Sequence, residues 1–166
     1  MNTSKLDNVE VKIVDSMDKI NNDWKSIGED DGSWTEAINI SLSKLGKSLG
    51  YEVYTKNCKF ATDGEWLYDI SWTIDDGEYI QELILALESE WYPNGILDDF
   101  QKLIVSIANY RVMIYWENNI VKANKLLRMF KKQVNMYKAT QSGDRYLFIR
   151  WIEGQDPIDY FLYVVP

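Results

Sequence analysis

The sequence predicts an α/β fold, a single domain in which helices flank a central mixed β-sheet. The chain has 166 residues, a length that suits one compact domain, and 46% of them are hydrophobic, which supplies a real core. An apolar strand, an amphipathic helix and a second apolar strand follow one another between residues 79 and 116. This order predicts a parallel crossover unit, the building block of α/β proteins.

The first segment, residues 1–32, is polar and acidic. We expect a loosely ordered arm there, with a short strand over Val9–Val14, followed by a single domain over residues 33–166. The segment lacks the continuous apolar stretch of a signal peptide. The longest apolar runs of the chain are far shorter than the roughly 20 residues that a membrane span needs, so no membrane association is expected.

The domain is expected to begin with a helix over residues 34–49. Ser33 is a suitable N-cap, and Glu36 three residues later completes a capping box. Gly50 ends the pattern. The apolar residues that recur at helical spacing are Trp34, Ile38, Leu42, Leu45 and Leu49.

Three strands are expected next, two of them short and one bearing acids. The alternation within the second strand places Tyr68, Ile70 and Trp72 on one face of the sheet, and Asp69 on the other. The three expected strands cover residues 51–55, 65–73 and 79–91.

The second half of the chain continues with alternating helices and strands. A helix that Asn118 or Asn119 caps is expected to run to Lys138, with a basic polar surface. The expected elements are the helices 96–108 and 119–138 and the strands 111–116, 145–151 and 160–164, with a loop over residues 153–157.

The composition excludes several kinds of chemistry. The chain has no histidine, so Ser-His-Asp and Cys-His mechanisms and histidine-ligated zinc are excluded. Its one cysteine, Cys58, cannot form an intramolecular disulfide, which favours a reducing, cytoplasmic location. Any catalysis would depend on carboxylates, lysine, tyrosine, serine or a hard cation such as Mg²⁺ held by oxygen ligands.

Charge is distributed unevenly along this acidic protein. The net charge of -8 speaks against nonspecific binding of nucleic acid. However, the segment from Phe60 to Gln101 has eleven acidic residues and no Lys or Arg, whereas the segment from Lys102 to Arg150 has ten basic residues and two acidic ones. One half is suited to hold metal and the other to contact phosphate. Differently solvated faces would give the same pattern.

Two acids end the apolar run Leu83–Leu87 in the sequence Glu88-Ser89-Glu90. Residues i and i+2 of a strand point to the same face, so Glu88 and Glu90 are expected to project side by side. Like charges at that distance repel, and burial of even one is costly. A divalent cation, a lysine or an open solvent-filled cleft would offset the cost.

The order of elements and acids resembles the PD-(D/E)xK superfamily, the restriction-endonuclease-like fold. In that family an Asp at the end of one strand precedes an acid-x-Lys motif on the next strand, and many members have a Glu on the first helix. Here Asp69, Glu88 and Glu36 match these three positions. The family's lysine position holds Glu90 instead. In some members the lysine lies on the following helix, where this chain has Gln101 and Lys102.

The resemblance implies a site for metal-dependent phosphodiester hydrolysis with Mg²⁺ or Mn²⁺ as cofactor. Asp69 and Glu88 would bind the metal, Glu90 would be a further ligand or a general base, and Glu36 would be an outer ligand or a ligand of a second metal. Lys102 would stabilise charge. The basic helix, with Gln101 before it, would contact nucleic acid through Gln101, Lys122, Lys125, Arg128 and Lys132.

Structural roles remain open for the same residues. The two strand-end glutamates would also suit a solvated surface, Glu36 a capping box, Asp69 a structural hydrogen bond, and Lys102 an exposed helix face. Two main functions therefore follow from the sequence, besides a third, a small-ligand-binding α/β domain unrelated to nucleases. One is a Mg²⁺-dependent nuclease, and the other is a catalytically inactive protein of the same fold that acts as a binding, regulatory or immunity-type partner. The corresponding partners are nucleic acid, another protein or a second copy of the chain.

Overall fold

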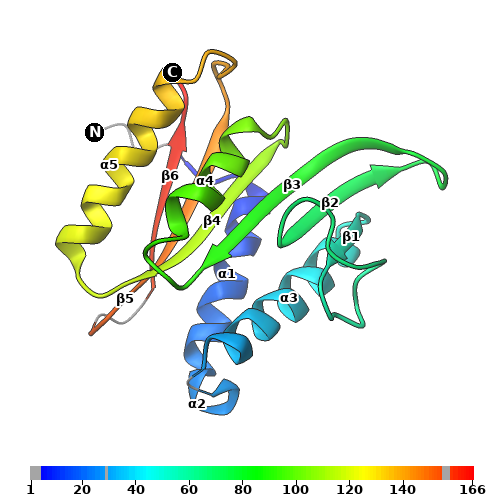
Figure 1. Cartoon of the computed structure of the whole chain (residues 1–166). Coiled ribbons are helices and arrows are strands. Elements are labelled where there is room, and N and C mark those ends of the chain that lie inside the picture. Colours follow the sequence, from blue (N-terminus) through cyan, green and yellow to red (C-terminus); the bar gives the residue numbers. More distant parts are fainter. Residues whose placement is uncertain (1–4, 29, 155–157) are drawn as a thin grey trace.

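The fold is a single six-stranded sheet with helices on both faces (Figure 1). The structure, a computed structural model, describes residues 5–28, 30–154 and 158–166. The strands lie side by side in the order in which they occur in the chain. They are β1 (Glu52–Thr55), β2 (Ile70–Asp75), β3 (Ile80–Glu90), β4 (Tyr110–Glu117), β5 (Arg145–Ile152) and β6 (Asp159–Val164).

The sheet is mixed, as the sequence predicts. Strands β1, β2 and β3 form an antiparallel meander, and β6 pairs antiparallel with β5. The centre is parallel, because α4 (Ile96–Val105) connects β3 to β4 and α5 (Ile120–Met136) connects β4 to β5. The expected crossover unit is confirmed. The carboxyl ends of β3, β4 and β5 consequently meet at one edge of the sheet, where α/β proteins commonly bind ligands.

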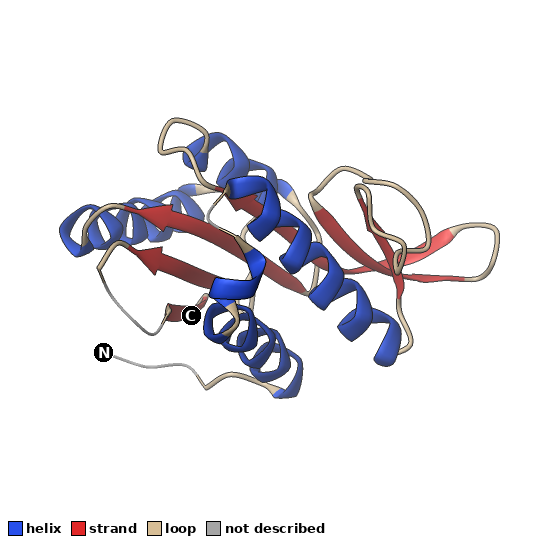
Figure 2. Ribbon diagram, turned by 90° about the horizontal axis from the view of Figure 1, so that it is seen from below, coloured by secondary structure: helices blue, strands red, loops and turns tan. Residues whose placement is uncertain are grey.

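Each face of the sheet has its own helices and its own core (Figure 2). The helices α1 (Asn8–Asn22) and α3 (Asp31–Ser48) pack on one face around Ile38, Trp72 and Val112. The helices α4 and α5 pack on the other face, where Phe100 and Phe130 are fully buried. A single turn, α2 (Trp24–Ile27), joins α1 to α3. In the described part of the chain, no helix is both long and apolar enough to cross a membrane.

The strand expected over Val9–Val14 is wrong, because these residues form the first turns of α1. Asp7 caps the helix and forms a capping box with Glu10. Ile13 and Met17 are fully buried in the core. The short run of β-branched residues suggested a strand, but the capping box and the helical spacing of the buried residues decide otherwise.

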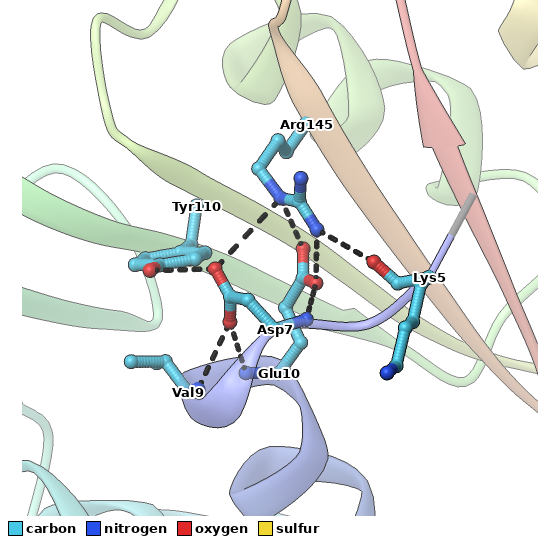
Figure 3. A network of polar contacts seen from close by, with 6 residues as sticks. All are labelled: Lys5, Asp7, Val9, Glu10, Tyr110 and Arg145. Carbon is cyan, nitrogen blue, oxygen red and sulfur yellow. Dashed lines mark hydrogen bonds and ion pairs between the residues drawn. The ribbon is translucent and has the colours of Figure 1, made fainter.

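A polar network holds the start of α1 against β4 and β5 (Figure 3). Arg145 on β5 donates from Nε to Glu10 Oε1 at 2.8 Å and from Nη2 to Glu10 Oε2 at 2.5 Å. Tyr110 on β4 donates to Asp7 Oδ2 at 2.9 Å. Glu10 is only 1% exposed, so the ion pair of Arg145 and Glu10 is largely buried between the N-terminal helix and the sheet.

The helix expected over residues 34–49 is confirmed as α3, but its cap is a different residue. Asp30 is the N-cap and accepts a hydrogen bond from the Ser33 amide at 2.9 Å, so the capping box of Ser33 and Glu36 is wrong. Glu36 is exposed. Gly50 follows the helix with a φ of 87°, a left-handed conformation that favours glycine after a helix end.

Three other expectations of the sequence need correction. Residues 65–69 are a loop and β2 begins only at Ile70, because Leu67 has a φ of 63° and interrupts the extended chain. Tyr68 therefore packs among the residues of α4 and α5, on the opposite face from Ile70. The helix expected to reach residue 108 ends at Val105. In the loop expected over residues 153–157, residues 155–157 lie outside the described residues.

Replacement of Gly46 by alanine should destabilise the fold, although alanine has the higher helix propensity. A Cβ at Gly46 would lie 2.7 Å from Trp72 Nε1 and 2.7 Å from Val53 Cγ2, so α3 could not stay this close to the sheet. Overpacking of this kind costs about 1–3 kcal/mol. Urea unfolding measures the cost. Gly64→Ala is the control, because a Cβ there meets nothing within 4 Å. Equal stability of the two variants would contradict the close packing.

Candidate functional site

The candidate site lies where β3 ends, at the carboxyl edge of the parallel strands. Glu88 is the last fully buried residue of the apolar run and is only 1% exposed. It faces α4, because Lys102 of that helix has its Nζ 3.3 Å from Glu88 Oε1. The alternation of β3 places Ser89 on the opposite face, toward α3. A buried acid therefore has a lysine from the next helix as its partner.

The charged form of the Glu88 carboxyl is disfavoured even though Lys102 lies beside it. Burial raises its pKa to about 8, and the nearby Asp69 carboxylate raises it as well, while Lys102 acts in the opposite direction. Glu88 Oε1 has no hydrogen bond of good geometry within the described part of the chain. Burial thus favours the neutral acid, and a cation at this point would shift the carboxyl toward its charged form.

Lys102 interacts with two acids at once. Its Nζ lies 2.7 Å from Asp99 Oδ1, one turn earlier on α4, in addition to its contact with Glu88. Partial burial lowers the pKa of Lys102, but the hydrogen bond to Asp99 and the charges of both acids outweigh this, so that its pKa lies above the ordinary value. The side chain is 51% exposed. It thus connects the buried Glu88 carboxyl with the protein surface.

Asp69 lies immediately before β2 and is tied to β3. Its Oδ2 accepts hydrogen bonds from the Ser89 amide at 2.7 Å and from the Ser89 hydroxyl at 3.0 Å. Burial raises the pKa of Asp69, which these two hydrogen bonds partly offset. The charges of Asp69, Glu88 and Lys102 influence one another. The structure therefore places three of the expected site residues at one strand end.

A cleft of about 560 Å³ opens beside Asp69 on the side of α3. Asp69 and Ser89 line one wall, and Glu36 and Asn39 of α3 line another. Asn39 is 8% exposed, and its Oδ1 accepts no hydrogen bond within the described residues. The cleft brings Glu36 and Asp69 together, whereas Glu88 and Lys102 lie toward α4 and do not line it.

Glu90 has a different environment from Glu88. Its Oε1 accepts a hydrogen bond from the Tyr92 amide at 2.8 Å. The side chain lies against Gly95, the residue that precedes α4, where a Cβ would clash with Glu90 Oε2. Both glutamates thus lie toward α4, but Glu90 stabilises the turn that leads into the helix, while Glu88 contacts Lys102.

The expected nucleic-acid contacts are not near the cleft. Gln101 is exposed on α4, and the four basic residues are exposed on α5. The helix α5 packs on the face of the sheet opposite to α3, so these side chains and the cleft are on opposite faces. The four residues are Lys122, Lys125, Arg128 and Lys132.

Three residues of the site were not predicted from the sequence as functional. Asp99 holds Lys102, and the spacing of three residues within a helix was an available signal. Ser89 binds Asp69 from the position between the two glutamates. Nothing in the sequence marked Asn39 on α3 as a site residue, because a polar residue one turn after Glu36 is ordinary for a helix surface.

The donors of the site are oxygen atoms, the ligands that hard divalent cations prefer. Among the described residues, however, no group of three or more acidic or cysteine side chains lies close enough together to hold a metal ion. Asp69 and Glu88 are the pair with raised pKa values at one strand end. Comparison of the chain with protein-family models, curated proteins and solved structures finds no match.

Proposed function

We propose that the protein is a Mg²⁺-dependent nuclease of the PD-(D/E)xK type in which Lys102 of α4 takes the place of the motif lysine. The observation that carries the proposal is the contact of Lys102 Nζ with Glu88 Oε1 at 3.3 Å. Glu90 occupies the usual lysine position of the motif, and the helix supplies a lysine to the second acid instead. The order α3, β1, β2, β3, α4 and β4 also agrees with the order of elements that the resemblance implies.

The two acids of the site supply oxygen donors of the kind that a divalent cation takes. Glu88 is buried with one oxygen that lacks a hydrogen bond within the described residues, and its pKa of about 8 shows that its charge is poorly compensated. Mg²⁺ is usually bound through one or two carboxylates, with waters and substrate phosphates as the remaining ligands. Asp69 and Glu88 would supply these two carboxylates. A bound cation would polarise a phosphoryl oxygen and acidify its water.

The protein's own groups have separable roles in this proposal. Lys102 is positioned to stabilise negative charge that develops on the phosphate, and Asp99 keeps it in place through the contact at 2.7 Å. Ser89 fixes Asp69 through two hydrogen bonds. Glu36, which lines the cleft beside Asp69, is an outer acid that would orient water.

Metal addition should stabilise the protein and support cleavage of a phosphodiester substrate. A ligand that binds only the native state raises the melting temperature. We expect MgCl₂ or MnCl₂ to do so for the wild type and not for Asp69→Asn. Lys102→Met should keep the metal response and lose about 10²-fold or more in the cleavage rate, the typical effect of removing one charge-stabilising donor. Differential scanning fluorimetry and single- and double-stranded DNA and RNA substrates provide the measurements.

Asp98→Asn is the matched control for Asp69→Asn, because Asp98 is exposed on the first turn of α4. It should behave like the wild type in both assays. The absence of a metal response, together with the absence of cleavage of all four substrates, would contradict the nuclease proposal.

That negative result would support the second candidate function, a catalytically inactive protein that acts as a binding, regulatory or immunity-type partner. A specific observation favours this alternative. Lys102 is already engaged by both Asp99 and Glu88, and Glu90 is engaged by the Tyr92 amide, so Lys102 and Glu90 have partners within the protein and need no substrate. In that case Lys102→Met would change stability and not activity.

A further inference from the structure

A second hollow, of about 570 Å³, lies beyond the carboxyl ends of the three parallel strands. Trp91 follows β3 directly, Trp116 is near the end of β4, and Trp151 is near the end of β5. Trp34 of α3 completes the aromatic lining. Four of the chain's seven tryptophans thus gather at the edge of the sheet where ligands of α/β proteins commonly bind.

Three of these rings are inclined to one another. Trp34 and Trp151 have centroids 5.2 Å apart at 67°, and Trp91 and Trp151 have centroids 5.8 Å apart at 52°. Two of the three indole N–H groups donate hydrogen bonds within the protein: Trp91 donates to Thr35 and Trp151 donates to Asn21. All four tryptophans are partly exposed. The hollow is therefore lined by aromatic surface whose N–H donors, for Trp91 and Trp151, are already engaged.

The charges at this hollow are negative. Asp31 and Glu153 line it, and its lining includes no Lys or Arg from the described part of the chain. The Asp31 carboxylate faces the Tyr92 hydroxyl, and this hydrogen bond raises the pKa of Tyr92. Carboxylates of this kind repel phosphates and attract cations.

We propose that this tryptophan pocket binds a small organic cation of the quaternary ammonium class. The faces of tryptophan rings attract cations through their quadrupole. Trp34, Trp91 and Trp151 pack against one another, so the cation would lie on the side of this aromatic cluster that lines the hollow. The two carboxylates add a favourable field without competing for hydrogen bonds, because a quaternary ammonium group has no N–H to donate. This inference does not depend on the proposed nuclease function: Asp31 lines both this hollow and the cleft beside Asp69, but neither Asp69 nor Glu88 lines this hollow.

Choline chloride is the probe for the first experiment. We expect saturable shifts of the indole N–H resonances of Trp34, Trp91, Trp116 and Trp151 in NMR spectra, with Trp66 and Trp72 as internal references outside the pocket. The uncharged isostere dimethylbutanol, in which carbon replaces the nitrogen, should bind at least about tenfold more weakly, since the cation–π and carboxylate attractions are then lost.

Substitutions distinguish the contribution of the Asp31 carboxylate from that of the aromatic rings. Asp31→Asn should weaken choline binding several-fold and leave the isostere unaffected, whereas Asp98→Asn should change neither. Trp116→Leu should weaken both ligands, and the dispersion of its spectrum reports whether it is folded. Equal affinity for choline and the isostere, the absence of saturable shifts, or preferred binding of adenosine monophosphate would each overturn the proposal. The last result would indicate a nucleobase site instead.

Discussion

Replacement of Glu88 by glutamine should raise the free energy of unfolding at pH 8 and above by several kcal/mol. In the wild type, folding raises the pKa of this carboxyl from 4.5 to about 8, because it is buried and lies near Asp69. The unfolded chain therefore releases a proton that the folded protein keeps. Since each pKa unit corresponds to about 1.4 kcal/mol, this difference is on the order of 5 kcal/mol.

The direction of the pH dependence follows from the raised pKa. The stabilising contribution of Glu88 is fully present below pH 4.5 and is lost as the pH rises to about 8. The wild type and Glu88→Gln should therefore be close in stability at pH 5 and separate as the pH increases. Urea unfolding in EDTA at several pH values measures this. Glu78→Gln is the matched control, because Glu78 is exposed in the turn between β2 and β3.

A variant that is less stable than the wild type from pH 5 to pH 9 would contradict this account. It would mean that the attraction between Glu88 and Lys102 exceeds the cost of burial. The same titration with Mg²⁺ has a different expectation. A cation that binds the ionised carboxyl would stabilise the wild type most at high pH and would leave Glu88→Gln unchanged.

The elements of the domain were largely predictable because their signals are local. The continuous run of buried residues in β3 and the helical spacing of α3 and α5 are properties of neighbouring residues. The start of the chain also had local signals for a helix, the capping box of Asp7 and Glu10 and the helical spacing of its apolar residues, but its position against the sheet was not predictable in this way. The partner of Glu10 in α1 is Arg145, which lies 135 residues away. No pattern among neighbouring residues predicts that α1 packs against the sheet.

The candidate site was predictable in its acids and not in its arrangement. Glu88 stood out because an acid directly follows an apolar run, and the order of Asp69 and Glu88 suggested that they meet. The sequence does not contain the turn of the chain at Leu67, which sets the direction of Asp69, or the engagement of Glu90 by the Tyr92 amide. It also placed the basic helix near the acids, whereas the sheet separates α5 from the cleft.

Replacement of Arg145 by methionine should destabilise the protein by about 3 kcal/mol or more. The variant keeps much of the side-chain volume but leaves the Glu10 carboxylate, which is 1% exposed, without its two charged hydrogen bonds. The loss should detach α1 from β5 and expose Ile13 and Met17. Urea unfolding measures the cost, and amide hydrogen exchange in α1 tests whether the helix opens before the sheet. Arg128→Met is the control, because Arg128 is exposed on α5.

The double variant Glu10→Gln with Arg145→Met identifies the cause. Glutamine at position 10 has no charge to bury and still accepts the Asp7 amide in the capping box, so the double variant should recover most of the lost stability. The coupling energy of the double-mutant cycle then reports the interaction itself. A double variant as unstable as Arg145→Met alone would show that the arginine acts through other contacts, such as its hydrogen bond to the Lys5 carbonyl at 3.2 Å. In that case the ion pair would not be what joins the N-terminal helix to the sheet.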